Sequence, residues 1–220
     1  MSKYNLAKKS QKIFLNNFKN YPEVLSIAPG RVNLIGEHVD YNSGLSMPAA
    51  IDRYVCVAMS KNDKKRVRVY SSTFQEMYDK SIKELKPTKL WHKYVLGSIS
   101  EAINGKILDR GLDVVISSDL PMGKGLSSSA ALEVSMIQAV SQIFNLELSD
   151  KEVIKKCQQV DHNHVGVLSG TLDQSASKLS KKGSLLLLDF RDNSFSYVSN
   201  SLSNCKWVLI DSMIKRELAT

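Results

Sequence analysis

The sequence agrees with an α+β protein, because segments with the apolar spacing of helices and segments with the alternation of strands follow one another in irregular order. Its 220 residues are enough for one large domain or two small ones. A content of 43% hydrophobic and 24% charged residues is typical of a globular chain with a core. The best candidate for a domain boundary lies near Lys181, Lys182 and Gly183.

The first half of the sequence predicts two helices and three strands. Apolar residues recur at helical spacing over 5–18, and a strand is expected at 24–28. The stretches 55–60 (VCVAMS) and 67–72 (VRVYSS) alternate strongly, so we expect them to pair as strands across the charged turn KNDKK. A second helix is expected over 90–104.

The second half predicts two more helices and three apolar strands. A buried strand over 113–121 is expected to stop at Pro121, which cannot continue the ladder. The helix over 127–146 begins with serines that suit capping positions and carries Glu133 near its positive end. A helix over 151–163 and strands at 184–190 and 206–211 follow.

The charge balance is compatible with an anionic partner. The chain carries 30 Lys and Arg against 22 Asp and Glu, for a formal net charge of +8. Such an excess fits a nucleotide and fits nucleic acid about as well, but the basic residues are scattered, as they are when charge serves solubility. We therefore expect no nucleic-acid partner, and we expect a monomer.

Cysteine spacing and hydropathy exclude a disulfide-rich or membrane-spanning class. The three cysteines lie far apart, so free thiols in a reducing cytosol are expected. The basic N-terminus has no apolar core of a signal peptide, and no apolar run is long enough for a membrane span. The predicted location is cytoplasmic. His162 and His164 lack a third ligand in the sequence and are expected to be surface histidines.

The segment PMGKGLSSSAALE (121–133) predicts an anion site. Gly123 and Gly125 allow a tight turn in which successive backbone N–H groups point at one anion, and the start of a helix attracts phosphate further. The segment is neither a P-loop, since no Lys-Ser or Lys-Thr follows the second glycine, nor a dinucleotide fingerprint, since a third glycine is missing. An ordinary strand-to-helix turn with serine caps is the alternative.

Two further segments carry polar groups at high density. GRVNLIGEHVDYNSG (30–44) places charged and amide side chains within a strand-like apolar stretch, and GTLDQSAS (170–177) contains Asp173. Alone, Asp173 is typical of a turn or a helix cap. Phosphoryl transfer to an alcohol, however, needs a carboxylate near the attacking hydroxyl, and Arg31 could keep that carboxylate ionised.

Together these segments resemble the galactokinase family of GHMP small-molecule kinases. GRVNLIGEHVDYNSG is similar to the galactokinase signature, PMGKGLSSSAALE to the nucleotide loop of GHMP kinases, and GTLDQ to their catalytic-aspartate segment, in the same order and from about residue 28 to 220. The resemblance implies an α+β fold. It comprises a GHMP kinase N-terminal domain at 1–181, with the mixed sheet and helices of the ribosomal protein S5 domain 2-like class, and the incomplete start of a ferredoxin-like C-terminal domain at 182–220.

The resemblance also implies a role for individual residues, with ATP and Mg²⁺ as cofactors. Asp173 matches the base that takes a proton from the sugar, and Arg31 matches the residue that orients it. The sugar contacts implied are Glu37, His38, Val39 and Asp40. The ATP contacts implied are Ser71, Gly123, Lys124, Gly125, Leu126, Ser127, Ser128 and Ser129. The Mg²⁺ ligands implied are Ser129 and Asp161, where Asp161 stands in place of the family's usual glutamate.

The implied function is ATP-dependent phosphorylation of the anomeric hydroxyl of D-galactose, which gives galactose 1-phosphate in galactose metabolism. The alternatives are a kinase of a related sugar such as N-acetylgalactosamine, a non-catalytic galactose and ATP sensor, or an inactive fragment. The intact LSSSAA sequence favours catalysis over sensing. The final DSMIKRELAT resembles the start of a segment that in the family leads to a sugar-contacting tyrosine. In a truncated chain the strands expected at 184–190 and 206–211 would lack their partners, so we expect the isolated chain to be poorly soluble and inactive.

Overall fold

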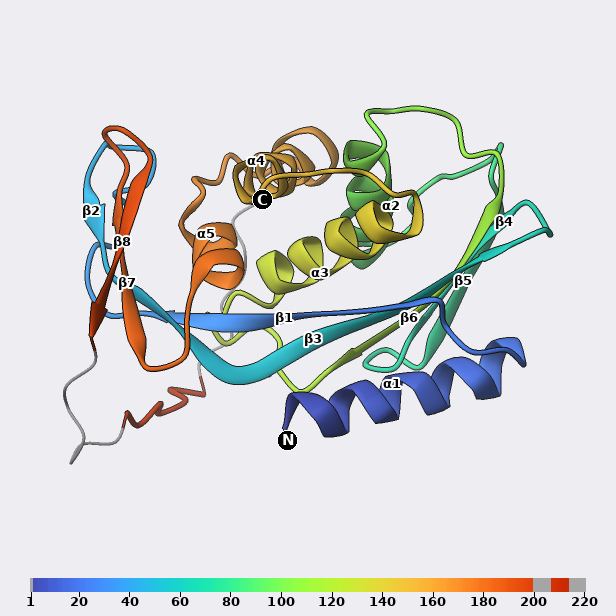
Figure 1. Ribbon diagram of the computed structural model, residues 1–220, viewed down its shortest axis with the longest axis horizontal. Coiled ribbons are helices and arrows are strands. Elements are labelled where there is room, and N and C mark those ends of the chain that lie inside the picture. Colours follow the sequence, from blue (N-terminus) through green and yellow to red (C-terminus); the bar gives the residue numbers. More distant parts are fainter. Residues whose placement is uncertain (1, 200–206, 214–220) are drawn as a thin grey trace.

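The computed structural model describes residues 2–199 and 207–213. Two sheets and a group of helices make up these residues (Figure 1). The helices are α1 (Lys3–Phe18), α2 (Leu90–Ala102), α3 (Ser128–Ile143), α4 (Asp150–Gln159), the π-helix η1 (Val160–Val165) and α5 (Leu172–Leu179). The strands are β1 (Val24–Asn33), β2 (Leu45–Ser46), β3 (Pro48–Asn62), β4 (Arg66–Ser71), β5 (Glu76–Ser81), β6 (Gly111–Ser118), β7 (Ser184–Asp189) and β8 (Ser194–Ser199).

The larger sheet is mixed, as the α+β class requires, and has the order β1-β3-β6-β4-β5. Only β4 and β6 run parallel. The expected pairing of 55–60 with 67–72 is wrong, because β6 lies between β3 and β4 and pairs with both. Gly111 begins β6 in the fork between the two strands, where an added Cβ would lie 2.2 Å from Asn62 Oδ1 and 2.3 Å from the Arg66 carbonyl oxygen. The absence of a side chain at Gly111 therefore lets β6 enter this fork.

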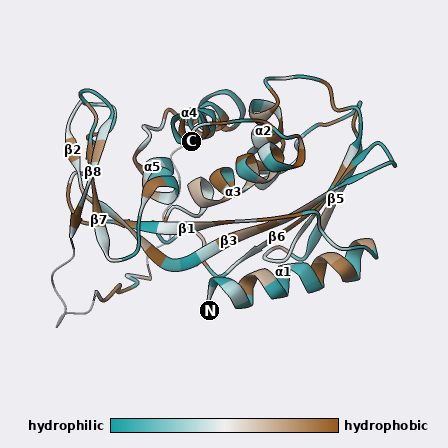
Figure 2. Ribbon diagram, viewed as in Figure 1, coloured by the Kyte–Doolittle hydropathy of each residue, from teal (hydrophilic) through white to brown (hydrophobic). Residues whose placement is uncertain are grey.

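The core lies between the sheet and the helices α2, α3 and α4, while α1 covers part of the opposite face (Figure 1). The hydropathy colours show apolar residues concentrated on β3 and β6, between these layers (Figure 2). Seven successive residues at the start of β6 are buried, as expected for a strand covered on both faces. On the outer face, Phe14 of α1 packs against Ala58 and Val115. Among the described residues no helix is both long and apolar enough to cross a membrane.

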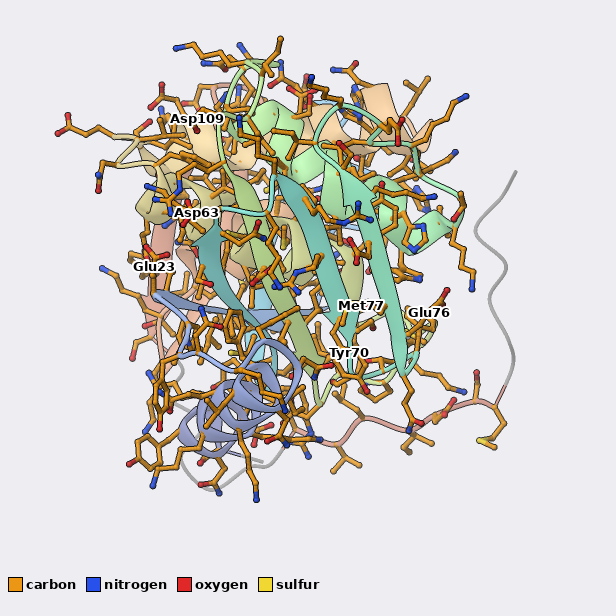
Figure 3. The ribbon with its side chains drawn as sticks, turned by 90° about the vertical axis from the view of Figure 1, so that its right-hand side faces the viewer. Glu23, Asp63, Tyr70, Glu76, Met77 and Asp109 are labelled. Carbon is orange, nitrogen blue, oxygen red and sulfur yellow. The ribbon has the colours of Figure 1, made fainter. Side chains whose placement is uncertain are left out.

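The outer face also contains a buried ion pair. The Arg68 guanidinium donates from Nε to Asp113 Oδ1 at 2.7 Å and from Nη2 to Asp113 Oδ2 at 2.6 Å. The side-chain amide of Asn62 donates to the same Asp113 Oδ1 at 2.6 Å. The Phe18 ring lies against the Arg68 guanidinium. The hydrogen bond to Asp113 raises the pKa of Arg68. Viewed from the β4–β5 end, Figure 3 shows Tyr70 of β4 and Met77 of β5; Tyr70 packs against the Phe14 cluster, whereas Met77 is 41% exposed.

The smaller sheet has the order β2-β7-β8 and takes strands from both sides of residue 181. Leu45 and Ser46 pair with Asp189 and Leu188, so β7 is joined to the strand that directly follows the segment 30–44 rather than standing alone. The division into domains at 181 remains a prediction. The strand expected at 206–211 is wrong for residues 207–211, which are exposed and form no ladder with any described strand. An apolar run becomes a strand only where a neighbouring strand supplies hydrogen-bond partners.

The other differences are local. The strand that Pro121 was expected to stop ends earlier, at Ser118, where the Ser118 and Asp119 side chains bond the backbone of neighbouring segments. The helix expected over 151–163 is α-helical to Gln159 and continues as η1. The strands β2, β5 and β8 and the helix α5 were not predicted. Cys56 and Cys157 are free, as expected, and both are buried, whereas Cys205 lies outside the described residues.

Candidate functional site

A cavity of about 530 Å³ opens between the end of the larger sheet, α2 and the start of α3. This volume lies within the range of small-molecule sites. The cavity brings together most of the residues assigned from the sequence to ATP binding and to catalysis: Arg31, Ser71, Gly123, Gly125, Leu126, Ser127, Ser128, Ser129 and Asp173. Lys124 is not part of the lining, because its ammonium forms an ion pair with Asp211 at 2.8 Å.

The Asp173 carboxylate is held at both oxygens. The Arg31 side chain donates from Nε to Asp173 Oδ1 at 2.8 Å, and its Nη2 lies 2.5 Å from the same oxygen. The Ser127 hydroxyl donates to Asp173 Oδ2 at 2.5 Å. A third guanidinium nitrogen, Nη1, donates to the Gly125 carbonyl oxygen at 2.6 Å. Arg31 therefore joins the carboxylate to the glycine-rich loop, and the carboxylate side chain remains about one-third exposed to the cavity.

Local backbone structure explains why these groups meet. The register of β1 against β3 shifts between Pro29 and Arg31, and the Arg31 N–H donates to the Leu126 carbonyl oxygen at 3.2 Å instead of to β3. The strand passes so close to the loop that a Cβ on Gly30 would lie 2.7 Å from that same oxygen. Asp173 lies in the first turn of α5, rather than in a turn or at a cap, where the helix dipole stabilises a negative charge.

The glycine-rich loop has the left-handed backbone that an anion-binding turn uses. Gly123, Gly125 and Ser127 have φ values of 68°, 69° and 53°. Ser127 occupies the N-cap position of α3, as expected, but its hydroxyl makes no capping bond and donates to Asp173 instead. Glu133 was expected near the positive end of α3, but the first turn contains no acid and Glu133 is fully buried. The N–H groups at the start of α3 remain available to an anion in the cavity.

The cavity is completed by aromatic residues that the sequence analysis missed. Phe74 and Trp91 stack with ring centroids 5.9 Å apart and planes 17° from parallel, and Tyr94 lies beside them in the lining. Burial raises the pKa of Tyr94 to about 12, with Asp161 and Glu133 adding to the shift. The sequence predicted a helix over 90–104 without a role for Trp91 or Tyr94, and nothing in the sequence linked Phe74 to α2.

The sugar-signature residues lie on a neighbouring loop and are not part of the cavity lining. Glu37 and His38 are exposed, whereas Val39 and Asp40 are half-buried. His38 has a φ of 57°, and its Nδ1 bonds the Tyr41 hydroxyl. Asp40 Oδ2 accepts from the Leu172 N–H at 3.2 Å, which places this loop directly against the segment that carries Asp173.

The two expected Mg²⁺ ligands are in different surroundings. Ser129 lines the cavity, whereas Asp161 is 6% exposed and accepts from the Ser169 hydroxyl at 2.6 Å and the Gln174 amide at 2.9 Å. Burial raises the pKa of Asp161 and raises that of Glu133 well above its usual value. Glu133 Oε1 is buried without a hydrogen-bond partner among the described residues. Hydroxyl and carboxylate oxygens are the donors that Mg²⁺ takes, so the residues fit this ion in kind.

The two histidines do not form a metal site. His162 Nε2 bonds the Ser169 carbonyl oxygen at 2.8 Å, and His164 Nε2 lies 3.0 Å from Glu101 Oε1. The sequence analysis expected surface histidines, but both rings are partly buried. Over residues 2–199 and 207–213, no cluster of three or more His, Cys, Asp and Glu side chains could hold a metal ion.

Comparisons with known proteins point to one family. The family model of the galactokinase galactose-binding signature matches residues 12–61, and that of the GHMP kinase N-terminal domain matches residues 92–181. A galactokinase of Thermosipho africanus is 40% identical over 88% of this chain and 54% of its own length. A galactokinase of Clostridium perfringens is 36% identical over 94% of this chain and 54% of its own length.

Solved structures share the same fold. The galactokinase of Lactococcus lactis, crystallised with galactose, superposes with a TM-score of 0.79 at 30% identity over 87% of this chain and 51% of its own. The mevalonate kinase of Methanococcus jannaschii gives a TM-score of 0.68 at 24% identity over 80% of this chain, which indicates the fold alone. The chain spans about half the length of the curated relatives it matches. With both family models in sequence order, the chain belongs to the galactokinase family of the GHMP kinases.

Proposed function

We propose that the protein carrying this chain is a galactokinase, which transfers the γ-phosphoryl group of ATP to the anomeric hydroxyl of D-galactose. The observation that supports this most directly is the Asp173 carboxylate, held by Arg31 and Ser127 at the edge of a cavity that also contains the glycine-rich loop. A carboxylate next to an anion-binding loop is the arrangement that phosphoryl transfer to an alcohol requires.

In this proposal Asp173 accepts the proton of the anomeric hydroxyl while the sugar oxygen bonds to the γ-phosphorus and the bond from that phosphorus to the ADP oxygen breaks. Arg31 holds the carboxylate pointed at the cavity, and its charge lies close to the transferred group. The N–H groups of the loop and of the start of α3 hold the phosphates. Mg²⁺, held by Ser129 and Asp161, would neutralise phosphate charge when bound.

The sugar is placed by the signature loop. We propose that Glu37, His38, Val39 and Asp40 contact the hydroxyl groups of galactose, since the loop lies against Leu172, next to Asp173. The Lactococcus lactis galactokinase, crystallised with galactose, supports galactose as the sugar. The protein is proposed to act as a cytoplasmic monomer.

The test of the function is ADP release by the protein that carries this chain, with galactose, with N-acetylgalactosamine and without sugar. Galactose-dependent release that exceeds the other two is expected. Faster release with N-acetylgalactosamine would reassign the substrate. Calorimetric binding of both galactose and ATP without ADP release would contradict a kinase and indicate a sensor instead.

We propose that Phe74 and Trp91 bind the nucleotide base by stacking. Phe74 is 45% exposed, so its replacement removes ring surface from the cavity without opening the core. Phe74→Ala is expected to raise the Kd of ADP about 5- to 100-fold, because base–aromatic stacking contributes about 1–3 kcal/mol. Fluorescence titration measures this Kd. Phe195→Ala, at a ring of similar exposure on β8, is the matched control and should leave it unchanged.

A second prediction separates sugar binding from nucleotide binding. An added Cβ at Gly170 would lie 2.0 Å from Asp40 Oδ2 and 2.1 Å from Asp40 Cγ, so Gly170→Ala must displace the Asp40 carboxylate. We expect the Kd of galactose to rise at least about tenfold, because the displaced Asp40 would lose one charge-assisted hydrogen bond to the sugar. Calorimetry measures both ligands, and the Kd of ADP should change less than about threefold. An unchanged galactose Kd would contradict the proposed role of Asp40.

A further inference from the structure

A buried polar network lies behind Asp173, on the side of α5 away from Arg31. Gln174, the next residue in α5, is 2% exposed, and its Nε2 donates to Asp161 Oδ2 at 2.9 Å and lies 3.4 Å from Glu133 Oε2. The Ser169 hydroxyl donates to the same Asp161 oxygen at 2.6 Å. One side-chain amide therefore connects α5 to α3 and to η1.

This network is costly for stability alone. Glu133 is fully buried, and both Glu133 Oε1 and Gln174 Oε1 lack a hydrogen-bond partner among the described residues. A buried polar atom without a partner costs about 1–3 kcal/mol, and apolar side chains of the same shape avoid that cost. Burial also raises the pKa of Glu133 well above its usual value. Glu133 and Gln174 therefore serve a purpose that apolar side chains next to Asp173 could not, which is to fix a geometry through directed hydrogen bonds.

The network is also in the right place to set geometry. Glu133 lies one turn after Ser129 on α3, so it faces the same side as the cavity-lining end of that helix. Asp173 precedes Gln174 in the first turn of α5, which has only eight residues. A fixed bond from Gln174 to α3 therefore restricts both the axial position and the rotation of the short helix that presents Asp173.

We infer that Gln174 is a positioning residue for Asp173, and that its amide, bonded to Asp161 and Glu133, fixes where the Asp173 carboxylate stands relative to Arg31 and Ser127. This inference rests on the proposed function only for the consequence of that position in catalysis. A side-chain NH₂ group has two hydrogens, one for each carboxyl group, which a carboxylate or a thioether at this position cannot supply.

The test uses the Arg31 guanidinium as a reporter in the protein that carries this chain, because its Nε donates to Asp173 at 2.8 Å. The ¹H–¹⁵N cross-peak of Arg31 Nε is assigned from its loss in Arg31→Lys. Gln174→Met is expected to shift or broaden this cross-peak, while Glu133→Gln, which keeps a donor and an acceptor, leaves it within a line width. Gln174→Asn, one methylene shorter, provides the same test if the methionine variant does not fold.

The matched control is Asn62→Leu. Asn62 is another buried amide that donates to a buried aspartate, Asp113, at 2.6 Å, but it lies away from the cavity lining. This variant should lose stability and leave the Arg31 cross-peak unchanged. If Gln174→Met and Gln174→Asn both leave the cross-peak in place, or if Asn62→Leu moves it equally, Gln174 is a structural residue and the inference is overturned.

A kinetic measurement extends the test to the proposed reaction. In the protein that carries this chain, Gln174→Met is expected to lower kcat about 10- to 100-fold with the KM for ATP within about threefold, as expected when a catalytic group is misplaced. A rise in the KM for ATP with kcat unchanged would overturn the positioning role. If the wild-type protein releases no ADP with any sugar, the proposed function fails, and the Arg31 cross-peak still decides the role of Gln174.

Discussion

Replacing Asp173 with asparagine is expected to lower the rate of galactose phosphorylation about 10³-fold. The amide cannot accept the proton of the sugar hydroxyl, and a positioned general base contributes about 10²- to 10⁴-fold. Asparagine keeps the shape of the side chain and one oxygen that can accept from Arg31 or Ser127. The change therefore removes the base and leaves the fold and the loop in place.

The measurement is kcat for galactose-dependent ADP release, with the Kd of ADP determined in parallel. The Kd should stay within about threefold of the unchanged protein, because Asp173 borders the phosphate end of the cavity and not its aromatic end. Asp189→Asn is the matched control, since Asp189 is an arginine-paired aspartate on β7, outside the cavity. A variant at Asp173 that retained more than about one-tenth of the rate would exclude this residue as the base.

The bond between Arg31 and Asp173 could be anticipated from the sequence, whereas the cavity wall could not. Arg31 lies in the segment 30–44 and Asp173 in the segment 170–177, and the resemblance of these two motifs to a family implies that their residues meet at one site. Phe74 and Trp91 meet because β5 turns back beside β4 and α2 then crosses the sheet, a long-range arrangement with no local signal. The sequence of α2 predicts an apolar face, and it does not say that one end of that face borders a ligand.

The pairing error at β3 and β4 has a related cause. Alternating residues and a charged turn predict a hairpin from local properties, but the hydrogen-bond partner of each strand is chosen by the whole sheet. A segment about 40 residues further along supplies β6, which is buried on both faces and takes the central place. Glu133 was misjudged for the same reason, because its partners Asp161 and Gln174 come from elements that follow it.

The second large effect concerns stability: Asp113→Ala is expected to lower the free energy of unfolding by about 3–5 kcal/mol. The Asp113 side chain is 3% exposed and accepts three hydrogen bonds, two from Arg68 and one from Asn62. Its removal leaves the Arg68 guanidinium, 17% exposed and covered by the Phe18 ring, without its counter-ion. An uncompensated charge in this position costs more than the lost contacts.

Urea denaturation followed by far-ultraviolet circular dichroism measures this loss in the protein that carries this chain. Asp63→Ala is the matched control, because Asp63 pairs with Arg110 but is 88% exposed on the β3–β4 turn (Figure 3). An exposed pair contributes at most about 1 kcal/mol, so this variant should unfold near the midpoint of the unchanged chain. Equal losses for the two variants would mean that burial does not govern the strength of the Arg68–Asp113 pair. A loss confined to Asp113→Ala would show that burial governs the strength of this pair, which adds a side-chain link to the backbone ladder between β4 and β6.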